Sequence, residues 1–202
     1  MTTILFATGN SRKITEAAAT LAPFDITVEP VRVQIDEIQH HDPTEITKAK
    51  ARAAYAAAGK PVVVSDTSWA IPALGGFPGG YMKDVSIWWN ADNWLDIMRS
   101  QADKRILCLE HVAYYDGNEL QHFVQQYEGR FIDEARGRVD DAEAIERVVI
   151  LYGNKTMAEQ LADGDIASAG EELGHWLQFG EWFATRQSSE ARYTQILQPD
   201  NK

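Results

Sequence analysis

The feature that most limits the fold of this chain is a short apolar run, Pro61–Val64, in which no polar residue alternates with the valines. A strand of this kind is buried on both faces, which is typical of a sheet with helices packed on either side. A strand pattern over 3–8 opens the chain, and helical patterns begin at Ser11 and cover 43–58. This order of strands and helices predicts the α/β class.

The rest of the chain divides into further short elements. The stretch 25–35 reads as two short strands, and Pro30 between them indicates an edge position. We predict a strand end at Ser65–Ser68, a glycine-rich loop over 73–83, one helix over 84–100, a hairpin of strands 105–115 and 119–132, and helices over 156–162 and 171–186. The segment 140–152 is ambiguous, and 187–202 reads as a tail or a late strand. Without repeats or linkers, residues 1–202 are predicted to form a single domain.

The charge balance excludes some partners. With 19 Lys and Arg against 30 Asp and Glu, the formal net charge is -11, whereas nucleic acids and anionic membrane surfaces attract basic proteins. We therefore expect no nucleic-acid or membrane partner. A small anionic ligand is compatible with this charge if lysines, a helix N-terminus or a metal ion make a local positive site. The chain shows neither a signal-peptide pattern nor the roughly 18 apolar residues of a membrane span, so we expect a cytoplasmic protein.

The first turn of the chain is suited to an anion. Gly9-Asn10 ends the first strand, and Asn10 or Ser11 can cap the helix that follows. A strand, turn and helix in this order direct backbone N–H groups and the positive end of the helix dipole at the turn, which suits phosphate. The same opening is also common as plain scaffold, so the pattern alone leaves both interpretations open.

Two charged residues occupy unusual places. Asp66 follows a buried strand directly, and ligands of open α/β sheets bind outside the carboxyl ends of strands. On the helix over 43–58, which Asp42 can cap, Lys50 borders the predicted buried face while Lys48 points to solvent. Lys50 is either a lysine whose stem lies on apolar surface while its ammonium stays in water, or a lysine with an anionic partner.

Together these features resemble a known family. The matching pieces are Thr8-Gly9-Asn10 with Lys13, the acidic loop with Glu37, Lys50, and Ser65-Asp66-Thr67-Ser68 followed by the glycine-rich loop Ala73–Lys83. In this order and spacing they are similar to the inosine triphosphate pyrophosphatase family. The resemblance covers about residues 3–137, and Lys155–Glu159 is similar to a later motif of the family.

The resemblance implies a fold and an activity. The fold is an elongated mixed sheet flanked by helices, with two lobes around a central substrate cleft, usually as a homodimer. The family uses Mg²⁺ to hydrolyse a nucleoside triphosphate to the monophosphate and pyrophosphate, which cleans the nucleotide pool. Carried over to this sequence, the resemblance assigns catalysis to Asp66, Lys50 and Lys13, magnesium to Glu37 and Asp66, and substrate binding to Thr8, Gly9, Asn10, Lys13, Thr67, Ser68, Gly76 and Lys83.

The chain departs from the family where the base is recognised. Residues 145–152 lack the family's aromatic and aspartate, and the places of its Ser-His-Arg motif hold Gly170-Glu171-Glu172. We therefore expect altered base specificity, with Glu171 and Glu172 as candidate substrate-binding residues. The alternative is that both acids only stabilise the start of a helix.

Two other functions remain open at this point. The missing base motifs also fit a phosphohydrolase that releases orthophosphate from another nucleotide or phosphometabolite. A non-catalytic nucleotide-binding protein is the third hypothesis. Trp88, Trp89 and Trp94 can stack on a base, although a helical core or a dimer interface explains them as well.

Overall fold

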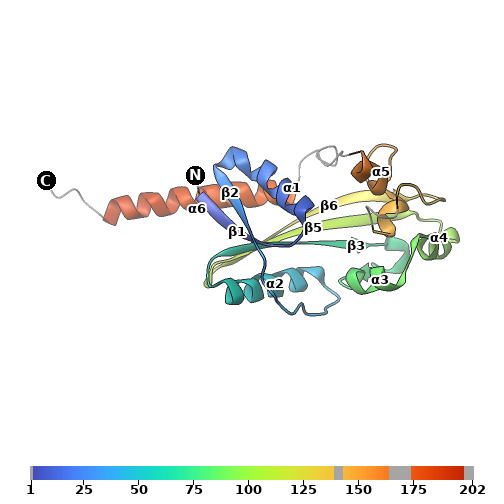
Figure 1. The fold of residues 1–202 in the computed structure, drawn as a ribbon, viewed down its shortest axis with the longest axis horizontal. Coiled ribbons are helices and arrows are strands. Elements are labelled where there is room, and N and C mark those ends of the chain that lie inside the picture. Colours follow the sequence, from blue (N-terminus) through green and yellow to red (C-terminus); the bar gives the residue numbers. More distant parts are fainter. Residues whose placement is uncertain (1, 139–142, 164–173, 198–202) are drawn as a thin grey trace.

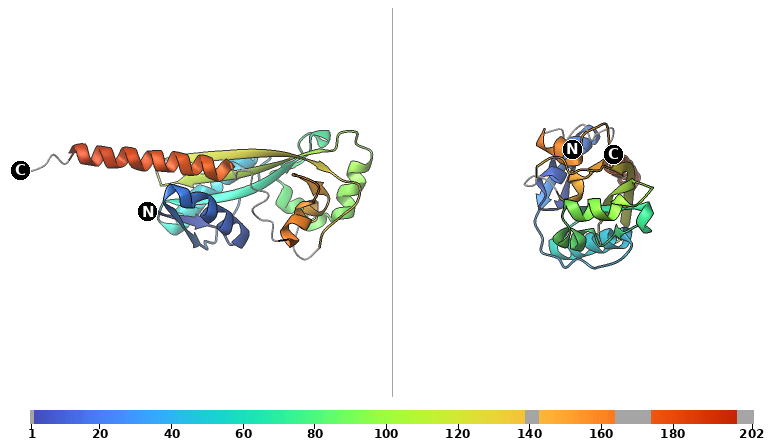
Figure 2. Two further views of the ribbon diagram at one scale, coloured as in Figure 1. Left: turned by 90° about the horizontal axis from the view of Figure 1, so that it is seen from above. Right: turned by 90° about the vertical axis from the view of Figure 1, so that its right-hand side faces the viewer.

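The computed structural model describes residues 2–138, 143–163 and 174–197. Within them, seven strands form one mixed sheet in the order β2-β1-β3-β5-β6-β7, and the short β4 pairs with β3 outside this path. The molecule is elongated, and α6 (Gly174–Leu197) lies along one side of the sheet (Figures 1 and 2). The predicted α/β class and elongated mixed sheet are confirmed.

The first three long strands are parallel and covered on both faces. β1 (Thr2–Ala7) lies between β2 (Ile26–Val31) and β3 (Val62–Ala70). One face packs against α1 (Ser11–Leu21) and the short turn η1 (Ala22–Phe24), and the other packs against α2 (Pro43–Ala58). Val62 and Val63 are 0% exposed, as the apolar run predicts.

The edge strand β2 differs from the prediction in its length. Pro30 lies in β2 at the outer edge of the sheet, where its missing N–H leaves no neighbour unpaired. The second strand piece expected after Pro30 does not form beyond Val31. The reason is that β1 ends at Ala7, which pairs with Val31, so the following residues have no strand beside them.

Antiparallel strands extend the sheet on its other side. β5 (Arg105–Tyr115) and β6 (Leu120–Phe131) form the predicted hairpin, and β5 pairs with all of β3. At the far end, two-residue strands complete the sheet: β4 (Pro78–Gly79) pairs with β3, and β7 (Val149–Ile150) pairs with β6.

Two helix predictions need correction. Residues 84–100 are not one helix but α3 (Met82–Trp88) and α4 (Ala91–Arg99), because Asn90 caps α4 in a reciprocal capping box with Asn93. The tail or late strand expected after 186 is also wrong for residues 187–197, which continue α6, since neither Gly nor Pro occurs there to end the helix. The helix predicted at 156–162 forms as α5 (Met157–Ala162).

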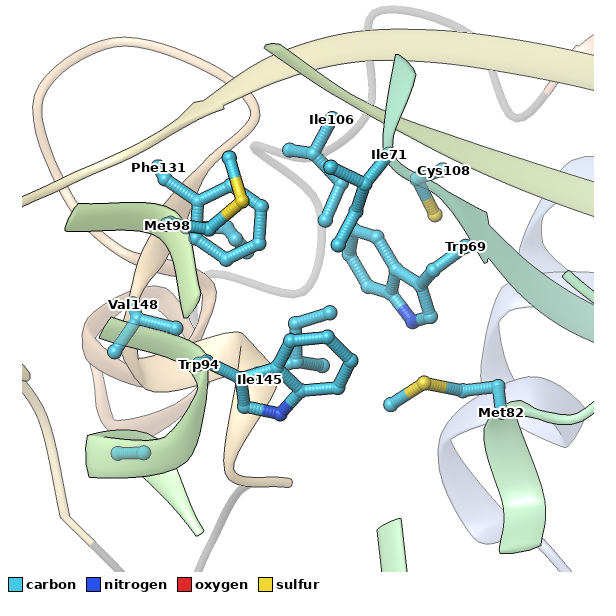
Figure 3. Close-up of a cluster of buried hydrophobic side chains, with 12 residues drawn as sticks. Trp69, Ile71, Met82, Trp94, Met98, Ile106, Cys108, Phe131, Ile145 and Val148 are labelled. Carbon is cyan, nitrogen blue, oxygen red and sulfur yellow. The ribbon is translucent and has the colours of Figure 1, made fainter. Parts of the chain in front are cut away.

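Buried side chains gather in two lobes on this sheet. Around β1 and the start of β3, one cluster faces α1 and α6 and another faces α2. At the far end, a third cluster joins Trp69, Trp94, Phe131 and Ile145, with the short turns η2 (Pro72–Leu74) and η3 (Ile145–Arg147) beside it (Figure 3). Cavities lined by residues of both lobes lie between these clusters.

Candidate active site

The site begins with a gap in the sheet. β1 pairs only with Val62 and Val63 of β3, and β4 pairs only with Trp69 and Ala70. Among the described strands, nothing pairs with Val64–Ser68 on that side, although β5 pairs with them on the other. Side chains of β3 alternate between the two faces of the sheet here, so neighbouring residues at the gap lie on opposite faces.

Asp66 is therefore placed differently from the prediction. The strand does not end at Ser65–Ser68, because pairing with β5 continues from Val62 to Ala70. Asp66 lies within β3 and not after its end. It still lies at an open strand edge, because β3 has no neighbouring strand on one side at the gap. The prediction expected this opening at the end of the strand.

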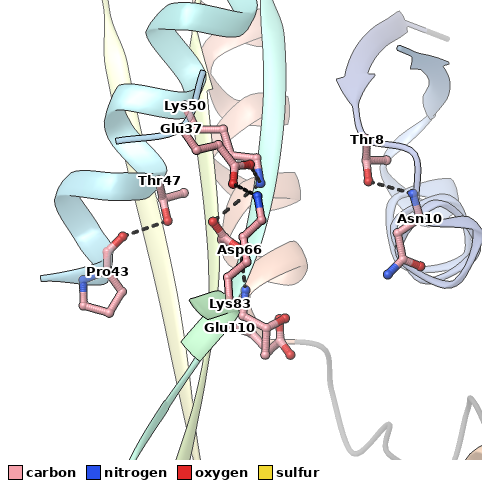
Figure 4. A network of polar contacts seen from close by, with 10 residues as sticks. Thr8, Asn10, Glu37, Pro43, Thr47, Lys50, Asp66, Lys83 and Glu110 are labelled. Carbon is pink, nitrogen blue, oxygen red and sulfur yellow. Dashed lines mark hydrogen bonds and ion pairs between the residues drawn. The ribbon is translucent and has the colours of Figure 1, made fainter. Parts of the chain in front are cut away.

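On the α2 side of β3, two carboxylates meet two lysines. Lys50 Nζ lies 2.9 Å from Glu37 Oε1 and 3.5 Å from Asp66 Oδ2, and Lys83 Nζ lies 2.8 Å from Glu37 Oε2 (Figure 4). Burial disfavours the charged form of Glu37, but the hydrogen bond from Lys83 and the ion pair with Lys50 outweigh it and lower the pKa of Glu37 to about 2. Of the two interpretations of Lys50, the one with anionic partners therefore holds.

The pair Lys48 and Lys50 shows how the helix sorts its charges. The buried residues of α2 are Thr47, Ala51 and Ala54, and Lys50 borders this face. Its side chain is 17% exposed and that of Lys48 is 30% exposed. Lys48 pairs only with Glu45 of its own helix among the described residues. The sequence prediction for both lysines is consistent with this geometry.

The turn before α1 holds Thr8, Gly9, Asn10 and Lys13. Asn10 caps the helix, accepting hydrogen bonds at Oδ1 from the N–H groups of Arg12 and Lys13, while its own N–H donates to Thr8 Oγ1 at 3.1 Å (Figure 4). Because the cap already uses these two N–H groups, anion binding at this turn rests more on the Lys13 ammonium than on the helix N-terminus.

Thr67 and Ser68 contact groups that the sequence analysis missed. Thr67 Oγ1 donates to Glu110 Oε2 at 2.9 Å, and burial raises the pKa of Glu110. On the other side of the strand, Ser68 Oγ lies 3.1 Å from His111 Nε2, and His111 Nδ1 lies 3.1 Å from His122 Nε2. Burial and the neighbouring His122 lower the pKa of His111 to about 4. Only the register of β5 against β3 reveals these partners.

Further charged residues that were not predicted lie on the α1 side. Arg12 NH1 lies 3.3 Å from Glu146 Oε1, and Arg12 Nε lies 3.9 Å from Glu16 Oε1. Burial raises the pKa of Glu16 to about 7, with Arg12 acting in the opposite direction. The only sequence signal for Arg12 was its place between Asn10 and Lys13, and no local pattern pointed to Glu146.

Most of the predicted site residues face shared cavities. A cavity of about 290 Å³ is lined by Asn10, Lys13, Glu37, Lys50, Asp66, Thr67 and Lys83, together with Arg12, Trp69 and Glu146. Thr8 and Gly9 line a second cavity that also reaches Glu37, Lys50 and Lys83, and Ser68 lines a third beside Asp66.

Among the predicted residues that the structure describes, Gly76 is not brought to these cavities. It sits in the turn after η2 with φ +94°, a backbone conformation that favours glycine, so its role there is to shape the loop. Glu171 and Glu172 lie outside the described residues.

The donor set at Asp66 fits a hard divalent cation. Glu37 and Asp66 present carboxylate oxygens to one cavity, and oxygen is the ligand that Mg²⁺ prefers. Among the described residues, no group of three or more His, Cys, Asp or Glu could hold a metal by itself. Mg²⁺ often binds through one or two carboxylates plus phosphate oxygens and water, so two protein ligands are enough.

Several known proteins are similar to this chain in sequence or in fold. A dITP/XTP pyrophosphatase of Pyrobaculum aerophilum is 33% identical over 178 residues, which are 86% of this chain and 95% of the relative. An inosine triphosphate pyrophosphatase of Aspergillus oryzae is 29% identical over 182 residues, 89% of this chain and 93% of the relative. A HAM1 protein from Coxiella burnetii shares the fold, with a TM-score of 0.71 over 94% of this chain and 100% of that one, at 20% identity.

The match to the family model reaches further than the sequence motifs. It covers residues 4–163, whereas the motifs supported the resemblance to about residue 137. No described helix has the length and apolar character needed to cross a membrane. The similarity to inosine triphosphate pyrophosphatases is thus confirmed, and the chain belongs to the Ham1 family.

Proposed function

We propose that this chain is a Mg²⁺-dependent pyrophosphatase that hydrolyses a nucleoside or deoxynucleoside triphosphate to the monophosphate and pyrophosphate. One observation carries the proposal: Asp66, Glu37, Lys13, Lys50 and Lys83 all face one cavity. Three lysines suit a triphosphate in an otherwise acidic protein, and two carboxylates suit its metal ion. The pyrophosphatase names of the relatives support this assignment.

Each of these residues has a proposed role in the reaction. Asp66 accepts the proton of the water that attacks the α-phosphorus, and Lys50, 3.5 Å from it, holds the carboxylate in place. Lys13 and Lys83 bind phosphate oxygens and offset their negative charge, because phosphoryl transfer depends mainly on positioning and charge neutralisation. Mg²⁺, held by Glu37 and Asp66, would add a further positive charge at the phosphates.

The segment that takes the place of the family's base motif supports altered specificity. In the segment that lacks the family motif, Ile145, Val148 and Val149 are fully buried in the far core. Tyr152 is engaged with Tyr127, their ring centroids being 5.7 Å apart. No aromatic side chain of this segment is therefore offered to a base. We propose that the protein cleans the cytoplasmic nucleotide pool with a base preference different from that of its relatives.

The test is a panel of standard and modified nucleoside triphosphates with Mg²⁺, in which pyrophosphate and orthophosphate are quantified separately. We expect pyrophosphate from at least one triphosphate and none when Mg²⁺ is chelated. Orthophosphate as the first product supports the other phosphohydrolase activity instead. Binding without any turnover supports a nucleotide-binding protein that is not an enzyme.

We also propose that the protein works as a homodimer. Ile87 and Trp88 of α3 are 73% and 80% exposed, and large apolar side chains at the surface often mark an interface. In contrast, Trp94 is fully buried and Trp89 packs against it with ring centroids 4.6 Å apart. Light scattering after size exclusion is expected to give the mass of a dimer, and Trp88→Glu is expected to give monomers. A monomeric wild type contradicts this proposal.

A further inference from the structure

Arg12 lies at the centre of a bridge between the two lobes. It stands in the first turn of α1, next to Lys13, and its NH1 lies 3.3 Å from Glu146 Oε1 in η3. The two residues are far apart in the sequence, and α1 and η3 pack into different buried clusters. Both side chains line the cavity of about 290 Å³ that also contains Lys13 and Asp66.

Glu146 is fixed as an anchor. Its side chain is 7% exposed, its Oε1 faces Arg12, and its Oε2 accepts a hydrogen bond from the Glu143 N–H at 2.8 Å. The neighbouring Ile145 is fully buried in the far core and holds η3 in place. Both oxygens of Glu146 thus have partners within the protein.

Arg12 still has hydrogen-bond donors to offer. A guanidinium carries five N–H donors. In Arg12, NH1 faces Glu146 and Nε faces Glu16. No described residue accepts a hydrogen bond from its NH2 group. The side chain is 29% exposed at the cavity, and a planar guanidinium with free donors binds phosphate oxygens in pairs.

Two local features favour an anion at Arg12, although Glu110, Glu143 and Glu146 also lie near it. Glu16, its partner on the same helix, has a pKa near 7 because of burial, so at neutral pH this carboxyl is only partly ionised. Lys13 adds a positive charge beside it in the same cavity. A purely structural bridge between the lobes is the alternative, and it predicts lost stability without any change in phosphate binding.

We infer that Arg12 is a further substrate-binding residue, which binds phosphate oxygens of the triphosphate, and that Glu146 is the residue that positions it across the cleft. The inference rests on the proposed function. It adds Arg12, a cation to which the motif Thr8-Gly9-Asn10 with Lys13 gives no role. It also gives the divergent segment around η3 a task at the phosphate end of the site.

The experiment measures binding of inorganic tripolyphosphate with Mg²⁺ by calorimetry, because this probe has neither base nor sugar. Arg12→Gln is expected to weaken binding about 10- to 100-fold, as the loss of charge-assisted hydrogen bonds predicts. Glu146→Gln is expected to weaken it by less, about 3- to 10-fold, and the double variant should equal Arg12→Gln alone, because Glu146 acts through Arg12. Arg99→Gln, which removes an exposed arginine on α4, is the matched control and should bind like the wild type.

Several outcomes would overturn the inference. Unchanged tripolyphosphate binding by a folded Arg12→Gln variant removes Arg12 from the phosphate site. Weaker binding of the nucleotide alone assigns Arg12 to base or sugar instead. Additive effects in the double variant give Glu146 a role independent of Arg12. Where Arg12→Gln does not fold, Arg12→Lys keeps the charge but loses the paired donors, and wild-type affinity in that variant contradicts the inference.

The same measurements separate this inference from the proposed function. Wild-type protein that binds tripolyphosphate through Arg12 but releases no pyrophosphate from any nucleotide refutes the proposed function and keeps the phosphate-binding role. Equal turnover of nucleotides by the wild type and by Arg12→Gln keeps the proposed function and refutes the inference about Arg12. The KM of that variant is expected to rise more than its kcat falls, because the contact is made in the bound substrate as well as in the transition state.

Discussion

The two sides of β3 at the gap differ in how far cations compensate their carboxyl groups. On the α2 side, the carboxylates of Glu37 and Asp66 are matched by Lys50 and Lys83 at 2.8–3.5 Å. On the α1 side, among the residues that the structure describes, two cations accompany four carboxyl groups; they are Arg12 and Lys13, with Glu16, Glu110, Glu143 and Glu146. One side is balanced by ion pairs, and the other carries excess acid.

This difference shows up in the pKa values of the carboxyl groups. On the α2 side, the lysines lower the pKa of Glu37 to about 2. On the α1 side, burial raises the pKa of Glu16 to about 7 and also raises the pKa of Glu110 and Glu143. Lysines therefore favour the ionised form of Glu37, whereas burial favours the protonated forms of Glu16, Glu110 and Glu143.

The largest effect is expected from breaking the α2 side at its carboxylate. Asp66→Asn should reduce kcat about 10²- to 10⁴-fold, the contribution of a positioned general base, while the nucleotide still binds. Steady-state kinetics with pyrophosphate detection measure it. Asp103→Asn, at a half-exposed aspartate that pairs with Arg105, is the matched control and should keep full activity. Near-normal turnover by Asp66→Asn would show that another group accepts the proton.

A smaller effect is expected from removing the lysine that joins the two carboxylates. Lys50→Gln leaves Glu37 and Asp66 close together with less positive charge, so kcat/KM should fall about 10- to 100-fold. Lys48→Gln, two residues earlier on the same helix and outside the cleft, should change kcat/KM by less than about twofold. Equal losses in both variants would mean that α2 as a whole, and not the Lys50 contact, matters.

The α1 side can be probed by stability instead of rate. The pKa of Glu16 is raised from 4.5 to about 7 in the folded protein. Between these two pH values Glu16 is ionised in the unfolded chain but still protonated in the folded one. The free energy of unfolding therefore falls as pH rises from 4.5 to about 7. Glu16→Gln should therefore raise the free energy of unfolding by about 2 kcal/mol more at pH 8 than at pH 5. Urea unfolding at both pH values measures it, and an equal effect at pH 5 and pH 8 would contradict the raised pKa.

The smallest effect concerns the histidine behind Ser68. The pKa of His111 is lowered from 6.5 to about 4, so the unfolded chain binds the proton first and stability falls as pH drops from 6.5 toward 4. Between pH 7 and pH 5 this amounts to about 1–2 kcal/mol. In His111→Gln the decline in the free energy of unfolding over this range should be smaller by that amount. The same slope in both proteins would assign the acid sensitivity to other groups.

The parts of the site that were predictable share one property. Lys13, Lys50 and Asp66 are recognisable from short motifs and from their place on a local element. Arg12 and Glu146 meet only because the fold brings the start of α1 and η3 to one cavity, and Glu110 and His111 face Thr67 and Ser68 only through the register of β5. A pattern read along the chain contains neither packing nor register, so these partners could not be derived from it.

The errors in the fold have equally specific causes. The break between α3 and α4 was readable in principle, since Asn90 and Asn93 form a capping box, but the apolar pattern of 84–100 runs across it. The length of α6 was readable from the absence of Gly and Pro in residues 187–198, but the polar composition of this stretch suggested a tail. The continuation of β3 past Asp66 depends on its partner β5 and could not be seen locally.

The gap in the sheet also has a consequence for how the molecule behaves among its own copies. Unpaired strand edges are the usual templates for aggregation, because another chain can add a strand to them. The open stretch Val64–Ser68 is enclosed between β1 and β4, so its free backbone is too short and too confined to receive a further strand. The outer edge β2 carries Pro30, which cannot donate to a neighbour. The sheet can thus keep backbone open for a small ligand without offering that backbone to another protein.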